Sequence, residues 1–207
     1  MRVLFFGDSI VYGSWDSQGG WVDRLKREAH AITLRSGGSQ KLQFINLGIG
    51  GDSSTKILAR LKNEIDARTS TSWPFAFVVC LGANDERTVD GVPETSLEQF
   101  ENNVRNIIEI LKASSDKVLF LGIPPVGADV VELKGREYSN EGLTRYDAVI
   151  ERVTNELGVK YMPLRPAFEA AGMEALYSYD NVHPNDSGHE LIAATIRPHL
   201  IKILEER

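Results

Sequence analysis

The fold is decided by the stretch Val3-Leu4-Phe5-Phe6-Gly7-Asp8-Ser9-Ile10-Val11-Tyr12-Gly13 near the start of the chain. It begins as an apolar run of strand character, stops abruptly at Gly7 and continues through a short polar segment. In an α/β domain this pattern is typical of a first parallel strand that leads into its helix. Ligands bind at the carboxyl edge of such sheets, which is where Ser9 lies. A serine there acts as a nucleophile only if the chain also supplies a base, an orienting acid and oxyanion donors.

The rest of the chain alternates strand and helix patterns. Strands are expected at residues 3–7, 42–45, 75–81, 117–122 and 159–162, and helices at about 21–34, 57–65, 96–111, 141–157 and 187–205. The run 75–81 is continuously apolar, as in a central strand that is covered on both faces. Short connections and right-handed crossovers favour an α/β fold with a five-stranded parallel sheet between two helix layers, a three-layer α/β/α sandwich.

Several segments between these elements are harder to interpret. Residues 126–138 have no clear period and are expected to form a long loop at the carboxyl edge, while residues 164–179 are expected to be irregular or partly helical. Ser187 and Glu190 have the spacing of a capping box for the last helix. Pro198 lies inside that helix and is expected to kink or split it.

Length, composition and charge limit the class of protein. The 207 residues suit a single domain spanning 1–207, and 42% hydrophobic with 25% charged residues is typical of a globular protein rather than a disordered or membrane one. A net charge of -6 argues against nucleic acid or an anionic membrane as the main partner. We therefore expect a small-molecule partner, while the oligomeric state stays open.

Cysteine usage and the chain start predict the compartment. Cys80 is the only cysteine, and its place in the apolar run predicts a buried, inert thiol. Met1 and Arg2 lead straight into the first strand, which leaves no room for a signal peptide, and no apolar run approaches the roughly 20 residues of a membrane-spanning helix. These features predict a cytoplasmic protein without stable membrane insertion.

Four polar turns supply candidate functional residues: Ser9, Gly51, Asn84 and the pair Asp180 and His183. Each has an ordinary structural explanation, as a helix cap, a turn residue or a surface histidine. Together they suit acyl transfer, because an acid three residues before His183 can orient its ring and stabilise the imidazolium formed when it takes a proton from Ser9. The Asn84 amide and the Gly51 N–H could donate to an oxyanion.

The same turns carry a family resemblance. Gly7-Asp8-Ser9-Ile10, Asn46-Leu47-Gly48-Ile49-Gly50-Gly51-Asp52-Ser53, Gly82-Ala83-Asn84-Asp85 and Asp180-Asn181-Val182-His183-Pro184-Asn185 resemble, in order, the four blocks of the SGNH hydrolase superfamily, also called the GDSL esterase/lipase family. The resemblance implies a flavodoxin-like sandwich and ester hydrolysis without a metal or cofactor. It also implies Ser9 as nucleophile, His183 as base, Asp180 as acid, and an oxyanion hole of Ser9, Gly51 and Asn84.

These observations predict a serine esterase for small or medium acyl groups. A thioesterase, lysophospholipase, acyltransferase or carbohydrate O-deacetylase with the same residues is an alternative. A flavodoxin-like ligand-binding module is a non-enzyme alternative, although the glycine motifs of phosphate-binding loops are absent. His183 and His189 are six residues apart, which is not the spacing of a helical metal pair, so no metal site is expected. The pocket walls are expected from residues 86–93 and 124–138 with Val11, Tyr12 and Trp15.

Overall fold

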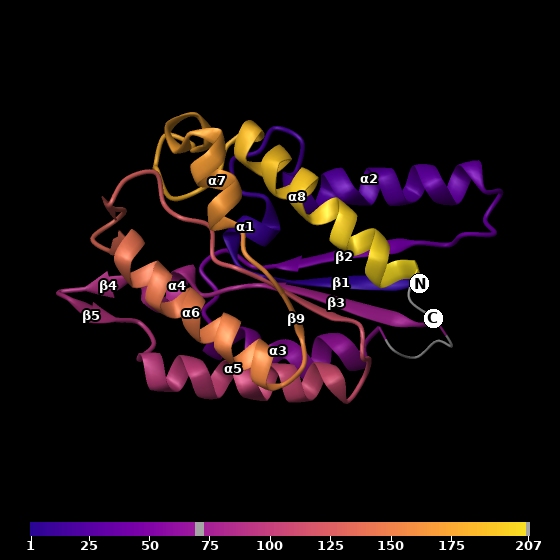
Figure 1. Cartoon of the computed structure of the whole chain (residues 1–207), viewed down its shortest axis with the longest axis horizontal. Helices are drawn as coiled ribbons and strands as arrows, with labels where there is room; N and C mark the ends of the chain where they lie inside the picture. Colours follow the sequence, from indigo (N-terminus) through magenta and orange to yellow (C-terminus); the bar gives the residue numbers. More distant parts are fainter. Residues whose placement is uncertain (69–72, 206–207) are drawn as a thin grey trace.

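A parallel sheet forms the centre of the computed structural model, which describes residues 1–68 and 73–205. Its strand order is β2-β1-β3-β6-β9 (Figure 1). The strands are β1 (Arg2–Gly7), β2 (Gln43–Gly48), β3 (Phe75–Cys80), β6 (Val118–Leu121) and β9 (Lys160–Met162). This order is that of a doubly wound, flavodoxin-like fold, and the predicted α/β/α sandwich with a five-stranded parallel sheet is confirmed.

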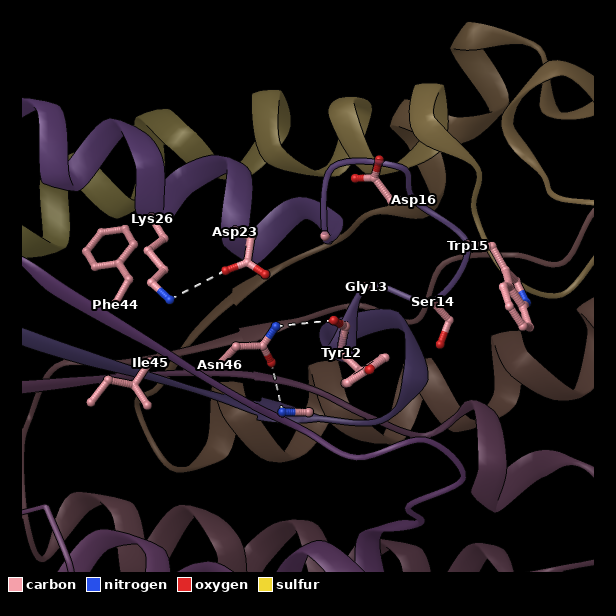
Figure 2. Close-up of a pocket in the computed structure, with 12 residues that line it drawn as sticks. Tyr12, Gly13, Ser14, Trp15, Asp16, Asp23, Lys26, Phe44, Ile45 and Asn46 are labelled. Atoms are coloured by element: carbon pink, nitrogen blue, oxygen red, sulfur yellow. Dashed lines mark hydrogen bonds and ion pairs between the residues drawn. The ribbon is translucent and has the colours of Figure 1, made fainter.

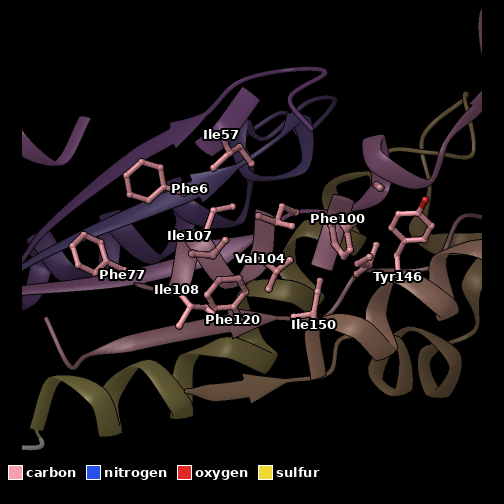
Figure 3. Close-up of a cluster of buried hydrophobic side chains, with 14 of the residues drawn as sticks. Phe6, Ile57, Phe77, Phe100, Val104, Ile107, Ile108, Phe120, Tyr146 and Ile150 are labelled. Atoms are coloured by element: carbon pink, nitrogen blue, oxygen red, sulfur yellow. The ribbon is translucent and has the colours of Figure 1, made fainter. Parts of the chain in front are cut away.

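Alternation along the strands explains the two helix layers. In β1, Leu4 and Phe6 point to one face of the sheet, and Val3 and Phe5 point to the other. The first face packs against α3 (Ser54–Asp66), α5 (Leu97–Lys112) and α6 (Asn140–Glu156). The second packs against α2 (Gly20–Arg35), α7 (Arg165–Ala171) and α8 (Asp186–Glu205). Figure 3 shows part of the first core, where Phe6 and Phe77 of the sheet lie near Ile57 and Ile107 of the helices.

Two short helices follow strands at the carboxyl edge. They are α1 (Ser9–Tyr12) after β1 and α4 (Ala83–Glu86) after β3. Glycine is needed at the ends of β1 and β2, because a Cβ at Gly7 would lie 2.2 Å from the Cys80 carbonyl oxygen, and one at Gly48 would lie 2.2 Å from the Tyr12 nitrogen. This close packing brings the start of α1 against the ends of the neighbouring strands.

A second, antiparallel sheet lies where a loop is predicted. Its strands, in the order β5-β4-β8-β7, are β4 (Thr88–Val89), β5 (Val92–Pro93), β7 (Val130–Glu132) and β8 (Glu137–Ser139). The prediction of a long loop over residues 126–138 is therefore wrong. Strands of two or three residues are too short to show a period in the sequence. Both hairpins turn on a pair of residues with positive φ, Asp90-Gly91 and Lys134-Gly135, as two-residue hairpin loops require.

The C-terminal region differs from two further predictions. Asn185, not Ser187, caps α8, because its Oδ1 accepts hydrogen bonds from the backbone N–H groups of Ser187 and Gly188. Of the kink or split expected at Pro198, the split does not occur, because α8 runs as one helix from Asp186 to Glu205. The segment 164–179 is partly helical as expected, with α7 followed by a 3₁₀ turn at Met173–Leu176.

Two other predictions concern single features. Cys80 is buried as predicted, and burial raises the pKa of its thiol well above the ordinary range. Among the described residues, no helix combines the length and apolar character needed to cross a membrane.

Candidate active site

Ser9 is the first residue of α1, directly after the end of β1. Asp8 caps this helix: its Oδ1 accepts a hydrogen bond from the Ile10 backbone N–H at 2.9 Å. The α1 turn ends at Gly13, which has a φ of +95° and donates its N–H to the Ser9 carbonyl. The Ser9 hydroxyl is thereby held at the carboxyl edge of the sheet, half-buried, where the sequence places it.

His183 and Asp180 form a continuous hydrogen-bonded chain with Ser9. The Nε2 atom of His183 lies 2.8 Å from the Ser9 Oγ, and its Nδ1 lies 2.7 Å from the Asp180 Oδ2. With the proton on Nδ1, the imidazole donates to Asp180 and offers the Nε2 lone pair to the serine hydroxyl. The structure thus brings together three side chains, of which Ser9 and His183 are 174 residues apart in the sequence.

The Asp180 carboxylate is fixed by its own turn. Its Oδ1 accepts from the backbone N–H groups of Val182 and His183 at 3.0 and 2.9 Å, with Asn181 in the left-handed region at φ +55°. Burial alone would raise the pKa of Asp180, but the hydrogen bonds from His183 and Val182 outweigh it and lower the pKa. The acid is therefore held in its ionised form beside the imidazole.

Trp15 adds a further contact that the sequence does not reveal. Its indole Nε1–H donates to the Asp180 Oδ2 at 2.9 Å, the same oxygen that His183 contacts. The ring stands edge-on to His183, with centroids 6.2 Å apart. Trp15 has a φ of +67°, a conformation uncommon for a bulky residue, and the surrounding contacts hold it there.

Gly51 lies on the turn after β2, and Asn84 lies in α4. Gly51 has a φ of +81°, and no atom lies within 4 Å of where its Cβ would be; a Cβ at the adjacent Gly50 would lie 3.9 Å from the Ser9 Cβ. The Asn84 Nδ2 donates to the Asp52 carbonyl oxygen at 3.0 Å and contacts the Asp8 Oδ2 at 3.4 Å. Because the contact with Asp8 is long, this hydrogen of the Asn84 amide is available to a stronger acceptor.

Arginine side chains keep these turns in place. Arg87 donates from Nη1 to the Asn84 Oδ1 at 2.8 Å, which fixes the direction of the Asn84 amide. Arg60 of α3 binds Asp52 through Nε at 2.8 Å, and its Nη2 reaches the carbonyl oxygens of Leu47 and Gly7 at 2.7 and 3.3 Å. One guanidinium therefore ties together the ends of β1 and β2 and the turn that carries Gly51.

Two buried carboxylates accompany the site. Burial raises the pKa of Asp8 to about 6, and the backbone hydrogen bond from Ile10 only partly offsets this. Asp85, fully buried, accepts from the Ser54 backbone N–H and hydroxyl, and burial raises its pKa as well. Asp85 thus links α4, which bears Asn84, to the start of α3.

The side chains considered for a metal have other partners. Asp186 accepts hydrogen bonds from the Ser17 backbone and side chain, and His189 is buried with Nε2 3.1 Å from the Ser14 carbonyl oxygen. In residues 1–68 and 73–205, no three His, Cys, Asp or Glu side chains cluster in a way that could hold a metal ion.

A groove of about 870 Å³ begins beside the site (Figure 2). Its lining includes Trp15, Tyr12 and Asn46 and extends to Asp23 and Lys26 of α2. Ser9, Asp180 and His183 are not part of the lining, but Trp15 lines the groove and also contacts Asp180 and His183.

Comparisons with known proteins agree with this architecture. A family model described as the GDSL-like lipase/acylhydrolase family matches residues 5–191. The chain is 26% identical over 219 residues to the GDSL esterase/lipase WDL1 of Oryza sativa subsp. japonica, covering 99% of this chain and 78% of that protein. It is 24% identical over 217 residues to the isoamyl acetate-hydrolyzing esterase of Saccharomyces cerevisiae, covering 99% and 86%.

Solved structures are similar as well. A lipase/acylhydrolase from Enterococcus faecalis superposes with a TM-score of 0.76 at 24% identity, covering 96% of this chain and 94% of that one. An acetylxylan esterase from Geobacillus stearothermophilus superposes with a TM-score of 0.74 at 17% identity, covering 100% and 94%. At these identities the two structures support the fold.

The sheet, the helix layers and the family match define a class of protein: this chain is a carboxylic ester hydrolase with an α/β/α sandwich. More narrowly, the chain belongs to the GDSL-like lipase/acylhydrolase family, of the SGNH hydrolase type. This assignment sets aside the alternative of a flavodoxin-like binding module.

Proposed function

We propose that the protein hydrolyses carboxylic esters of small or medium acyl groups through a serine-bound acyl intermediate. The observation that carries this proposal is the unbroken chain from the Ser9 Oγ through His183 to Asp180, with contacts of 2.8 and 2.7 Å. Such an arrangement activates a hydroxyl that would otherwise be a weak nucleophile at neutral pH.

In the first half-reaction, the Ser9 Oγ attacks the ester carbonyl carbon while His183 Nε2 takes the hydroxyl proton. Asp180 orients the ring and stabilises the imidazolium that forms. The resulting oxyanion is held by the backbone N–H groups of Ser9 and Gly51 and by the Asn84 amide. Each such donor contributes about 2.7–4 kcal/mol to lowering the barrier. His183 then protonates the leaving alcohol oxygen as its bond to the acyl carbon breaks.

In the second half-reaction, water attacks the acyl carbon and gives a proton to His183. The acyl–oxygen bond to Ser9 breaks, His183 returns the proton to the Ser9 Oγ, and the carboxylic acid leaves. Esters of small acyl groups are the favoured substrates, because the related yeast protein is named for isoamyl acetate hydrolysis. No metal or cofactor enters these steps.

The test is hydrolysis of p-nitrophenyl esters from acetyl to palmitoyl by the wild type and by Ser9→Ala. We expect turnover on the shorter chains, and a loss of about 10⁴-fold or more in Ser9→Ala with an unchanged circular dichroism spectrum. A folded Ser9→Ala enzyme with wild-type turnover contradicts the mechanism. Rates that rise toward palmitoyl, or faster cleavage of matched thioesters, assign the site to the lysophospholipase or thioesterase alternative.

A further inference from the structure

The Asn84 amide could be placed in either of two orientations, because its oxygen and its NH2 group are nearly the same size. In the proposed reaction, on which this inference rests, only one orientation serves: Nδ2 must donate to the oxyanion that forms when Ser9 attacks the carbonyl carbon. The opposite orientation would turn Oδ1 toward that negative charge and oppose its formation. The contribution of Asn84 therefore depends on the groups that fix its amide.

These groups specify the amide from both ends. The Arg87 Nη1 donates to the Asn84 Oδ1 at 2.8 Å, and a guanidinium has donors only. At the other end, the Asp52 carbonyl oxygen accepts from Nδ2 at 3.0 Å, and a carbonyl is an acceptor only. A rotated amide would lose both hydrogen bonds, and Asn84 and Arg87 are both buried, so water has little access to replace them.

The small antiparallel sheet holds Arg87 in turn. Arg87 lies between α4 and β4, next to the β4–β5 hairpin (Figure 1). Its Nε donates to the Glu94 Oε2 at 2.7 Å, its Nη2 contacts the same oxygen, and its carbonyl oxygen accepts from the Glu94 backbone N–H at 3.0 Å. The Tyr138 hydroxyl of β8 is hydrogen-bonded to the same guanidinium. Glu94 thus takes Nε and Nη2, and Nη1 is left for Asn84.

We propose that Arg87 is a positioning residue of the oxyanion hole, and that it acts through the Asn84 amide. It holds Nδ2 toward the oxyanion, and its positive charge at Oδ1 withdraws electron density from the amide, which makes the N–H a stronger donor. The Glu94 and Tyr138 contacts give this arginine its fixed position. The small antiparallel sheet therefore contributes to catalysis without supplying a group that touches the substrate.

A double-mutant cycle tests whether Arg87 acts through Asn84. Wild type, Arg87→Met, Asn84→Ala and the double variant are compared by kcat and KM for p-nitrophenyl acetate, with circular dichroism to confirm folding. Arg197→Met is the matched control, because it breaks a similar two-contact pair with a glutamate, Glu28, between α8 and α2. Arg87→Lys keeps the charge but not the planar fork of donors.

We expect Asn84→Ala to lower kcat by about 10²- to 10³-fold, as for the loss of one oxyanion donor. Arg87→Met should lower kcat by about 10- to 100-fold with KM changed less than about twofold, the range for a hydrogen bond to a charged group. In the Asn84→Ala background the same change should have less than about a twofold effect, because no amide is left to hold. Arg197→Met should change neither constant.

Arg87→Lys keeps the test decisive if Arg87→Met does not fold. Its smaller loss in kcat, about threefold to tenfold, should likewise disappear in the Asn84→Ala background. Equal losses from the Arg87 variant in both backgrounds, or a loss confined to KM, would overturn the proposal, since a merely structural arginine acts independently of the amide.

Ser9→Ala separates this inference from the ester-hydrolysis proposal. Wild-type turnover by a folded Ser9→Ala enzyme rejects the mechanism, and this inference with it. Turnover that is lost in Ser9→Ala, together with independent losses from Arg87→Met and Asn84→Ala, rejects the role of Arg87 alone and leaves the mechanism in place.

Discussion

At the residue scale, the hydrogen bond from Trp15 to Asp180 is the part of the site whose role is easiest to isolate. The Asp180 Oδ2 divides its lone pairs between the Trp15 indole and the His183 ring. The indole N–H holds that oxygen from a second direction, so the carboxylate stays aligned with the imidazole ring. Trp15 therefore orients Asp180 and, through it, His183, as a positioning residue.

We expect Trp15→Phe, which keeps a ring but loses the N–H, to lower kcat for ethyl acetate by up to about tenfold with little change in KM. This follows because the Asp180 carboxylate that orients the His183 ring loses one hydrogen bond, worth about 0.5–1.5 kcal/mol. Steady-state kinetics on ethyl acetate measure the change. Tyr179→Phe, which keeps the neighbouring ring, should leave kcat in place; an unchanged kcat in Trp15→Phe would show that the contact does not position Asp180.

Sequence reasoning could predict Ser9, Asp180, His183, Gly51 and Asn84 as candidates, because each lies in a short motif on a turn. The structure brings Ser9, His183 and Asp180 into contact and joins Asn84 to Asp8, the residue before Ser9. A Cβ at Gly50, the residue before Gly51, would lie 3.9 Å from the Ser9 Cβ. The hydrogen bond from Trp15 could not be predicted, since 165 residues separate it from Asp180 and an aromatic residue in a loop carries no signal for its partner.

At the scale of elements, the turn from Asp180 to Asn185 and the start of α8 act as one unit. Asn185 caps α8 with its Oδ1, and its Nδ2 donates to the carbonyl oxygens of Ala175 and Tyr177 at 3.0 and 2.9 Å. The Asn185 side chain thereby connects the start of α8 to the segment before the Asp180 turn through hydrogen bonds. The position of His183 depends on these hydrogen bonds.

We expect Asn185→Ala to lower the free energy of unfolding by about 1–3 kcal/mol, because a helix cap and two hydrogen bonds to backbone carbonyl groups are lost together. Ser187→Ala, at the position the sequence favours as a cap, should change it by less than about 0.5 kcal/mol. Urea denaturation of both variants measures the difference. If Ser187→Ala were the more damaging change, Ser187 rather than Asn185 would be the cap.

The elements that sequence reasoning could find are those with enough residues to show a period. The five parallel strands and the long helices carry continuous or periodic apolar patterns, as in Phe75–Cys80 and Leu97–Lys112. The small antiparallel sheet has strands of two or three residues, so only its Asp90-Gly91 turn gives a local signal. The sequence does not separate Asn185 from Ser187 as the cap of the last helix, because both are good cap residues two positions apart.

At the scale of the whole molecule, the two cores depend on the same strands. Leu4 and Phe6 belong to one core, and Val3 and Phe5 belong to the other. Unfolding of β1 would therefore expose both cores. We propose on this basis that residues 1–207 form one domain that unfolds in a single cooperative transition. The ionisation of any buried group should then change the stability of the entire molecule.

Asp8 is the buried group for which this dependence is sharpest. Its pKa rises from 3.8 to about 6 on burial, so the folded protein keeps the proton where the unfolded chain has lost it. Asp8 therefore leaves the free energy of unfolding unaffected below about pH 4. It lowers that free energy progressively as the pH rises from about 4 to 6, and the free energy stays lower above pH 6. The pKa change corresponds to a loss of about 3 kcal/mol.

We expect Asp8→Asn, which keeps an oxygen acceptor for the Ile10 N–H, to remove this fall. The gain in unfolding free energy relative to the wild type should grow by about 3 kcal/mol between pH 4 and pH 7, on top of a pH-independent offset from the altered contact with Asn84. Urea denaturation at several pH values, followed by fluorescence and circular dichroism, measures both the gain and the number of transitions. A pH-independent difference would mean that Asp8 is ionised throughout, and two separate transitions would mean that the two cores unfold independently despite sharing a sheet.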